Sequence, residues 1–478
     1  MISLLIDPTL EYPSSLDFFS PDEQFPEYPF THLSSVKNPI YRAVRNCIAQ
    51  SGLDSEHFNT PLWNPFGGFI KPGDRIFVLC NFANERRSNE LVMDFQSRCT
   101  HGSVLRAIID YILIATARTG TISFGNAPTQ FCHWNQVLAD TGADRVLQYY
   151  HDNNCQIEAC DLRLYVTDAS YLGAIRSVER RDETRGVHVN LGADSLLTAL
   201  DLNPKHRYRI MNYDPSRTEY FHSGGKHEYV VNRQILDADV IFSIPKLKTH
   251  EKVGISCAIK GFVGTVGHKE SLPHHRFGSP NVGGDEYPSD RWGVLQLASG
   301  FHERVQHTTP DSNRGSVLRA AYRVLRRAMR PIAPIVEGAW WGNDTAWRMV
   351  LDLVRIATYA SNYGEMQTKP CRRHLVMIDG IYGGEGEGPA FPTAVRSGVL
   401  LFGDNLPAVD TMNALLMGFD PEKIPLVREA SCLAKYPIAS RPMDEERVIY
   451  KGQNLAVKDF QANPTYHFKP SDGWLGKI

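Results

Sequence analysis

Residues 238–264, ADVIFSIPKLKTHEKVGISCAIKGFVG, join the pattern of a buried strand to a basic segment. The run from Ala238 to Ile244 is mostly apolar, which is typical of a strand inside a parallel sheet. Four lysines and a histidine follow within fifteen residues: Lys246, Lys248, His250, Lys252 and Lys260. We therefore expect cationic side chains to gather at the carboxyl end of a core strand.

The chain before this stretch predicts further layers of an α/β fold. Strand and helix patterns alternate over residues 74–82, 101–119, 120–129, 135–153 and 155–163. This alternation predicts a doubly wound, mostly parallel sheet with helices on both faces. Ligands of such sheets bind at the carboxyl ends of the strands, so we expect the loops after the first two strands to border a site.

Five segments are expected along the chain. They are an N-terminal extension (1–60), a first α/β portion (61–162), a β-rich insertion (163–235), a second α/β portion (236–440) and a C-terminal appendage (441–478). The second α/β portion holds the basic segment described above and a glycine-rich segment. The sequence therefore predicts that the site lies mainly in residues 236–440.

The overall composition limits the partners, cofactors and location that we expect for this protein. The 478 residues are 42% hydrophobic and 22% charged, with a net charge of −2, so the overall charge favours neither nucleic acid nor a membrane as partner. The nine cysteines are dispersed and none has C-x-x-C spacing, so no iron–sulfur motif is present. The amino terminus lacks a secretory pattern, and no apolar run is long enough to span a bilayer, so we expect a cytoplasmic protein.

The basic segment indicates an anion site. If residues 246–250 are extended, Lys246, Lys248 and His250 share one face, with Thr249 between them. Lysines bind phosphate or carboxylate, and histidine exchanges protons near neutral pH. Lys260 is expected to join the site, where burial would lower its pKa and let it act as base or nucleophile. The alternative is that these lysines pair with acidic residues elsewhere in the fold.

A second candidate is the glycine-rich segment DGIYGGEGEGPAFP, residues 379–392. We predict a loop in which Gly384, Gly386 and Gly388 let the backbone approach a ligand closely. The carboxylates of this segment are expected to act as a general base or to bind a divalent cation such as Mg²⁺. They are Asp379, the predicted base, with Glu385 and Glu387 as metal ligands. The alternative is a flexible acidic loop.

Other candidates lie further along the chain. Asn343 is a predicted binding residue, and Asp344 and Asp404 are predicted metal ligands. A segment with His268, His274 and His275 indicates either metal or proton chemistry or a lid that also carries Arg276. A basic helix at 317–330 carries Arg319, Arg323, Arg326, Arg327 and Arg330 and is interpreted as a solvated face or a contact between copies of the chain.

Three of these motifs, in order, resemble a known family. SIPKLKTHEKVGISCAIKGFVG, IDGIYGGEGEGPAFP and GDNLPAVDTMNALLMGFDP are similar to the motifs of the bacterial and archaeal domain of unknown function 362, although Gly261 stands where asparagine is common. The similarity spans roughly residues 70–430 and implies an α/β fold. Long versions like this one resemble those encoded among polysaccharide-biosynthesis genes. The resemblance implies little about activity.

Two functions from different classes follow. The first is a cytoplasmic biosynthetic enzyme acting on an anionic small molecule, with a divalent cation where the carboxylates gather. The second is a non-catalytic carrier or scaffold that uses the same lysines and glycines. A weaker third reading is a redox protein with a cluster assembled from the dispersed cysteines. Because a carrier needs no acid–base pair, the histidine together with carboxylates favours the enzyme.

Overall fold

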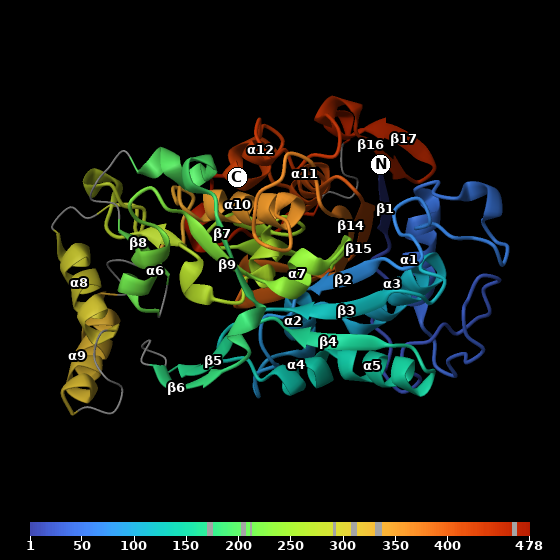
Figure 1. The fold of residues 1–478 in the computed structure, drawn as a ribbon, viewed down its shortest axis with the longest axis horizontal. Coiled ribbons are helices and arrows are strands. Elements are labelled where there is room, and N and C mark those ends of the chain that lie inside the picture. The colour runs from blue at the N-terminus through green and yellow to red at the C-terminus, as the bar shows by residue number, and fades with distance from the viewer. Residues whose placement is uncertain are drawn as a thin grey trace.

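The computed structural model describes residues 1–169, 175–201, 207–210, 213–289, 293–306, 313–329, 337–460 and 466–478. Its centre is a large mixed sheet (Figure 1). The strands in spatial order are β17 (Gln453–Ala456), β16 (Arg447–Tyr450), β1 (Ile2–Ile6), β15 (Phe391–Gly403), β14 (Arg373–Glu387), β10 (Val240–Ile244), β2 (Arg75–Cys80), β3 (Thr121–Asn126) and β4 (Ile157–Asp161).

Strands β14, β10, β2, β3 and β4 are parallel to one another, as the sequence predicts. Beyond them, β15 pairs antiparallel with both β14 and β1. Two short strands, β11 (Lys246–His250) and β12 (Gly254–Ser256), extend the sheet beside the end of β14. The sheet is therefore parallel from β14 to β4, and it is antiparallel where β15 pairs with β14 and with β1.

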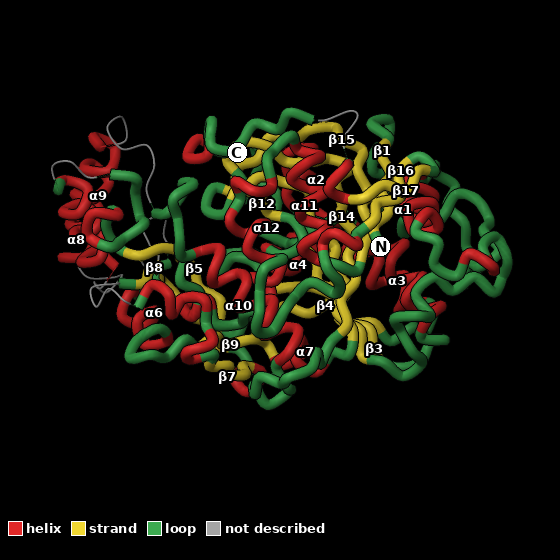
Figure 2. Tube along the Cα trace, turned by 90° about the horizontal axis from the view of Figure 1, so that it is seen from above, coloured by secondary structure: helices red, strands yellow, loops and turns green. Residues whose placement is uncertain are grey.

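Helices cover both faces of the sheet (Figure 2). The described helices are α1 (Pro39–Gln50), α2 (Val92–Arg98), α3 (Gly102–Ala115), α4 (Trp134–Thr141), α5 (Ala143–Asp152), α6 (Pro215–Phe221), α7 (Arg233–Asp237), α8 (Val294–Gln306), α9 (Asn313–Met329), α10 (Ala346–Tyr359), α11 (Leu406–Met417) and α12 (Pro425–Ala430). Alternate residues of β2 divide between two cores: Ile76 and Val78 pack with α1 and α3, whereas Phe77 and Leu79 pack with α10 and α11. The chain is thus an α/β protein.

The predicted β-rich segment, 163–235, holds short strands outside the main sheet. The described residues of this segment contribute to three two-stranded sheets: β5 (Tyr165–Ala169) with β6 (Ile175–Arg180), β7 (Gly186–Asn190) with β9 (Glu228–Asn232), and β8 (Tyr208–Arg209) with β13 (His275–Arg276). Because β13 comes from residues beyond the segment, the loop that carries the predicted histidines is fixed against it.

Candidate functional site

The basic segment continues directly from the central sheet. After Pro245, β11 runs parallel to β14, so that Lys246 lies opposite Asp379 and Lys248 opposite Gly384. Residues 246–250 are extended, as predicted, and all five are buried. The two segments that the sequence selected are therefore neighbouring strands.

The glycine-rich segment is a strand, and the prediction of a loop was wrong. Strand β14 continues to Glu387 and pairs with β15 along its length. A Cβ atom on Gly384 would lie 3.0 Å from the Cβ of Lys248, and one on Gly388 would lie 2.2 Å from the carbonyl oxygen of Thr249. These glycines let β11 approach β14, where the sequence suggested approach to a ligand.

Thr249 has a structural contact in the same place. Its hydroxyl donates to the carbonyl of Gly386 at 2.9 Å. Gly386 itself has φ +78°, a left-handed conformation that favours glycine. The predicted binding residues Thr249, Gly384, Gly386 and Gly388 therefore hold β11 onto the hairpin.

Lys246 forms a buried ion pair. Its Nζ lies 3.0 Å from Oδ1 of Asp379, and both side chains are fully buried. Nζ also donates to the hydroxyl of Tyr12 at 2.8 Å, and the backbone N–H of His101 donates to the other carboxylate oxygen at 3.0 Å. Burial lowers the pKa of Lys246, while the charge of Asp379 opposes this shift. For Lys246 the pairing alternative is therefore correct.

Lys248 is buried without a carboxylate. Its Nζ donates to Oδ1 of Asn81 at 2.7 Å and to the carbonyl of Arg98 at 2.8 Å. Burial lowers its pKa to about 7. Asn81 belongs to the loop after β2, so the predicted rim of the site does meet the basic segment.

Lys248 is one of six basic groups that interact electrostatically, which we call the lysine–histidine cluster. β11 and the turn after it, a 3₁₀ helix at Lys260–Thr265, and the segment leading to β13 supply its members. The members are Lys248, His250, Lys252, Lys260, Lys269 and His274.

The lysines of this cluster have almost no acidic partners. Lys252 donates to the carbonyl of Glu337, and Lys269 donates to the carbonyl of Ala127 at 2.8 Å. Lys260 makes no hydrogen bond or ion pair with the residues that the structure describes. The half-buried carboxylate of Glu251 lies 3.8 Å from Lys252 and is the cluster's one ion-pair partner within the described part of the chain.

Burial, and after it mutual repulsion, lowers the pKa values of the cluster. Burial, followed by the charge of Lys252, lowers the pKa of Lys260 to about 8. Burial and then Lys260 lower the pKa of Lys269 to about 7 and that of His274 to about 3. The same two causes hold the pKa of His250 well below its usual value. The charge of Lys260 thus acts on four other members, Lys248 included, and an anion beside it would oppose its effect on their pKa values.

The two histidines are held in opposite tautomers. Nδ1 of His250 accepts the backbone N–H of Lys252 at 3.1 Å, so the proton of the neutral ring is on Nε2. Nδ1 of His274 lies 2.9 Å from the carbonyl of Leu272 and must donate to it, so Nε2 of this ring carries a lone pair. His250 offers a donor and His274 an acceptor. Lys260 and His274 are partly exposed, which opens the cluster to solvent.

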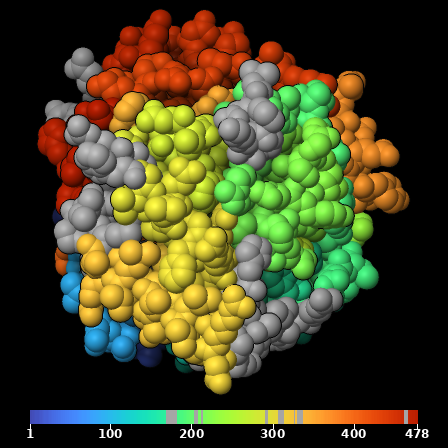
Figure 3. Space-filling view, turned by 90° about the vertical axis from the view of Figure 1, so that its left-hand side faces the viewer, coloured from blue at the N-terminus to red at the C-terminus, as the bar shows by residue number. Residues whose placement is uncertain are grey.

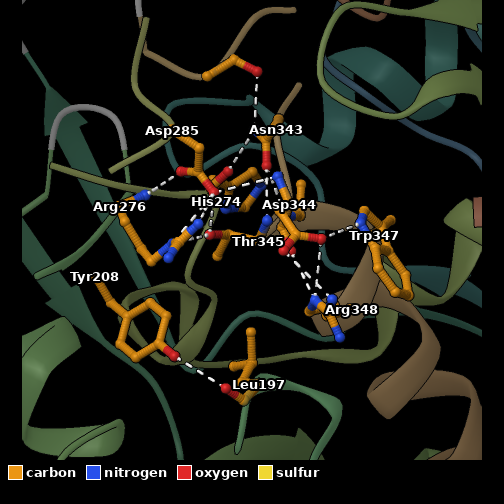
Figure 4. Close-up of polar contacts among 12 residues, drawn as sticks. Leu197, Tyr208, His274, Arg276, Asp285, Asn343, Asp344, Thr345, Trp347 and Arg348 are labelled. Carbon is orange, nitrogen blue, oxygen red and sulfur yellow. Dashed lines mark hydrogen bonds and ion pairs between the residues drawn. The ribbon is translucent and has the colours of Figure 1, made fainter. Parts of the chain in front are cut away.

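Asn343 lies beside the cluster and has a structural role (Figure 4). Its Nδ2 donates to the carbonyls of His274 and Gly338 at 2.9 and 2.8 Å. Its Oδ1 accepts the backbone N–H groups of Thr345 and Ala346 at the start of α10. Asn343 therefore fixes the backbone that carries His274 against α10.

The four carboxylates predicted to bind a metal have separate partners. Asp344 pairs with Arg348 at 3.1 Å (Figure 4), Glu385 accepts the N–H of Lys469, Glu387 accepts the N–H of Asp472, and Asp404 pairs with Arg441. The structure therefore does not bring them into one site. In the described ranges no three His, Cys, Asp or Glu side chains are arranged to hold a metal ion.

Several site residues had escaped the sequence analysis. Lys269 sits among the histidines that were noticed, in the stretch GHKES, and its charge was a usable signal. Tyr12, whose ring stacks on His101 at 3.9 Å, comes from the N-terminal extension, where no sequence pattern marks it.

A groove of about 740 Å³ lies away from this site, at the amino ends of β2, β3 and β4, and is lined in part by Arg75 and Thr121.

Comparisons with known proteins bear on the family. A crystal structure of a protein from Thermotoga maritima is similar at 11% identity with a TM-score of 0.30, over 74% of this chain and 53% of that one. This chain thus spans about half the length of that protein. A comparison with curated proteins gives no match. None of the helices described is both long and apolar enough to cross a bilayer. The family model named Domain of unknown function (DUF362) matches residues 154–414, more than half of the chain, and the chain belongs to this family.

Proposed function

We propose that the chain is an enzyme that binds a phosphate- or carboxylate-bearing small molecule at the lysine–histidine cluster. One observation carries this proposal. Lys248, Lys260 and Lys269 are placed together and form no ion pair with a carboxylate among the described residues, and the ammonium group of Lys260 makes no hydrogen bond there. Gathering unpaired cations away from water is expensive, so such a group is expected where an anionic ligand supplies the missing charge.

The roles follow from the donors available. Lys260 binds the anion first, because its ammonium group is free and its side chain is partly exposed. Lys248, Lys252 and Lys269 add positive charge from the walls. The Nε2–H of His250 donates a hydrogen bond or a proton to the ligand, and the Nε2 lone pair of His274 accepts one. Lys246 and Asp379 act by positioning β11, since they satisfy each other.

A non-catalytic carrier is the second candidate function. The cationic charge suits a carrier as well as an enzyme, but the opposite tautomers of His250 and His274 favour the enzyme. A carrier needs donors to an anion and gains nothing from an added acceptor. Biosynthetic metabolism, including that of surface polysaccharides, belongs to this proposal through the family resemblance. The proposal keeps the cytoplasm as the expected location from the sequence analysis, and a divalent cation would arrive with the ligand.

Binding is tested first with inorganic phosphate, diphosphate and citrate, by calorimetry on the full chain. Lys260→Met should weaken binding by at least about tenfold, because it removes the free cation at the entrance. The substitution should not lower the thermal midpoint, because it also removes the repulsion between Lys260 and the other lysines of the cluster. Lys458→Met, at an exposed lysine away from the cluster, is the matched control. Equal anion binding by wild type and Lys260→Met would contradict the proposed site.

Turnover is tested separately, with a mixture of phosphorylated and carboxylated metabolites followed by mass spectrometry. The enzyme proposal expects a mass change that disappears in His250→Gln while anion binding persists. If the protein binds anions but no metabolite in the mixture changes mass, the result would instead support the carrier.

A further inference from the structure

Helices α8 and α9 form a hairpin at one end of the molecule, away from the main sheet (Figures 1 and 2). The hairpin has a small core of its own. Val305 and Tyr322 are buried there, with Phe301, Leu318 and Leu325 packed against them. One side of α9 is therefore used to hold α8, and the other side is free to face outward.

The outward side of α9 is apolar along its middle. Val317 and Val324 are 68% and 71% exposed, and Ala320, Ala321 and Ala328 are exposed as well. Their spacing of three and four residues places them in one stripe along the helix. In the end view of Figure 3, the yellow to light-orange part of the chain that includes these two helices lies in the centre and lower part of the face, beside green and red parts. On α8, Leu297 is 76% exposed as well.

Arginines flank this stripe. Arg314, Arg323 and Arg327 are exposed on its two sides, whereas Arg319 is buried. The side chain of Arg326 and residue Arg330 lie outside the described part of the chain. Residues 313–329 contain five arginines and no aspartate or glutamate. Of the predicted arginine face, Arg323 and Arg327 are therefore exposed beside an apolar stripe, and Arg319 is buried.

We propose that the outer face of the α8–α9 hairpin binds an anionic lipid surface, with α9 lying in the plane of the headgroups. An apolar stripe bordered by cations is the pattern by which a helix rests on a bilayer without crossing it. The arginines contact lipid phosphates while Val317 and Val324 enter the interfacial layer. The proposal is independent of the anion site and revises the sequence-based expectation that no membrane is involved.

Two other occupants fit this face less well. A second copy of the chain, packed through the same stripe, would bring the arginines of α9 against each other, with no carboxylate on α9 to relieve them. A nucleic acid would satisfy the arginines but would leave the exposed valines and Leu297 without an apolar partner. A bilayer surface supplies both kinds of contact.

The test is flotation of the full chain with vesicles of phosphatidylcholine alone or mixed with phosphatidylglycerol. We expect binding to the mixed vesicles only, weakening as salt is added. Val317→Asp/Val324→Asp and Arg323→Glu/Arg327→Glu should each reduce binding at least about tenfold. The matched controls are Tyr363→Asp and Arg145→Glu, at exposed positions on other elements, and these should bind as the wild type does.

Three results would overturn the proposal. The first is equal binding to both kinds of vesicle, or binding to neither. The second is a dimer in light scattering that the valine variant dissociates, which would make this face an interface between copies. The third is binding of duplex DNA or RNA that is lost in the arginine variant and kept in the valine variant. Circular dichroism of each variant shows whether the hairpin remains folded.

Discussion

Two lysines in the same sequence pattern have different partners in this chain. Lys246 and Lys248 stand two apart on one extended strand, as the sequence predicts, yet one pairs with Asp379 and the other has only neutral partners. The spacing fixes the shared face, because alternation along a strand is local. The partners come from β14 and from the loop after β2, and nothing local specifies them. The sequence therefore predicts that Lys246 and Lys248 share a face but not which of them lacks a carboxylate partner.

Asp379→Asn should destabilise the protein strongly. The substitution leaves the buried ammonium of Lys246 without its counter-charge, which lowers the free energy of unfolding by about 3–5 kcal/mol. Urea unfolding followed by circular dichroism measures this loss. The double variant Lys246→Met/Asp379→Leu should recover most of it, and Asp152→Asn, at an exposed carboxylate of α5, is the control. A loss in Asp379→Asn no larger than in the control would show that the pair contributes nothing.

Stability should rise with pH above neutrality. The pKa of Lys248 and that of Lys269 are each lowered to about 7 in the folded chain, against 10.5 when exposed. Between these values the unfolded chain binds more protons, so the free energy of unfolding increases with pH, and below about 7 the full penalty of the buried charges is present. Anion binding should change in the opposite direction and weaken as the lysines lose their protons.

Thermal midpoints measured from pH about 7 to about 9 follow this trend. Lys248→Met/Lys269→Met should flatten the rise, and saturating phosphate should also flatten it, because a bound anion holds both lysines charged. A midpoint that falls over this range in the wild type, or a rise unchanged in the double variant, would contradict the assignment of these lysines.

At the scale of elements, long periodic segments were predictable and the glycine-rich segment was not. The predicted strand at 74–82 is β2 (Arg75–Cys80), and the predicted helix at 101–119 is α3 (Gly102–Ala115). Both have local signals of burial and period. Glycines normally indicate a loop, but in β14 they are needed because the neighbouring strand β11 packs closely on the backbone. That requirement is tertiary, so the residue types alone point to the wrong element.

Gly384→Ala should separate β11 from the β14–β15 hairpin. Its Cβ would lie 2.9 Å from the Cβ of Pro392 and 3.0 Å from that of Lys248, so one strand must move, at about 1–3 kcal/mol. We expect a lower thermal midpoint and weaker phosphate binding, since Lys248 belongs to the cluster. Gly261→Ala is the matched control near the same site, because its Cβ meets nothing closer than 3.9 Å. Equal behaviour of the two variants would mean that the close approach of the strands is unimportant.

At the scale of the whole molecule, both terminal segments close on the basic strand. Tyr12 of the N-terminal extension contacts Lys246, and Nε1 of Trp474 donates to the carbonyl of Glu251 at 2.7 Å. Both segments looked peripheral in the sequence because they lack periodic patterns. Their contacts with β11 and the turn after it show that the basic segment is held by parts of the chain far from it in sequence.

Trp474→Ala tests whether this closure supports the site. The indole is almost fully buried against Gly254, the first residue of β12, which lies between β11 and the 3₁₀ helix of Lys260. Its removal leaves a cavity that lowers the free energy of unfolding by about 3–5 kcal/mol. It also removes the hydrogen bond that the indole donates to the carbonyl of Glu251. Hydrogen exchange of residues 250–256 should accelerate, and phosphate binding should weaken because Lys252 and Lys260 lose their fixed spacing. Leu475→Ala, at the half-exposed neighbour, should change neither quantity. If Trp474→Ala lowers stability but leaves both exchange and binding as in the wild type, the C-terminal segment stabilises the fold without shaping the lysine–histidine cluster.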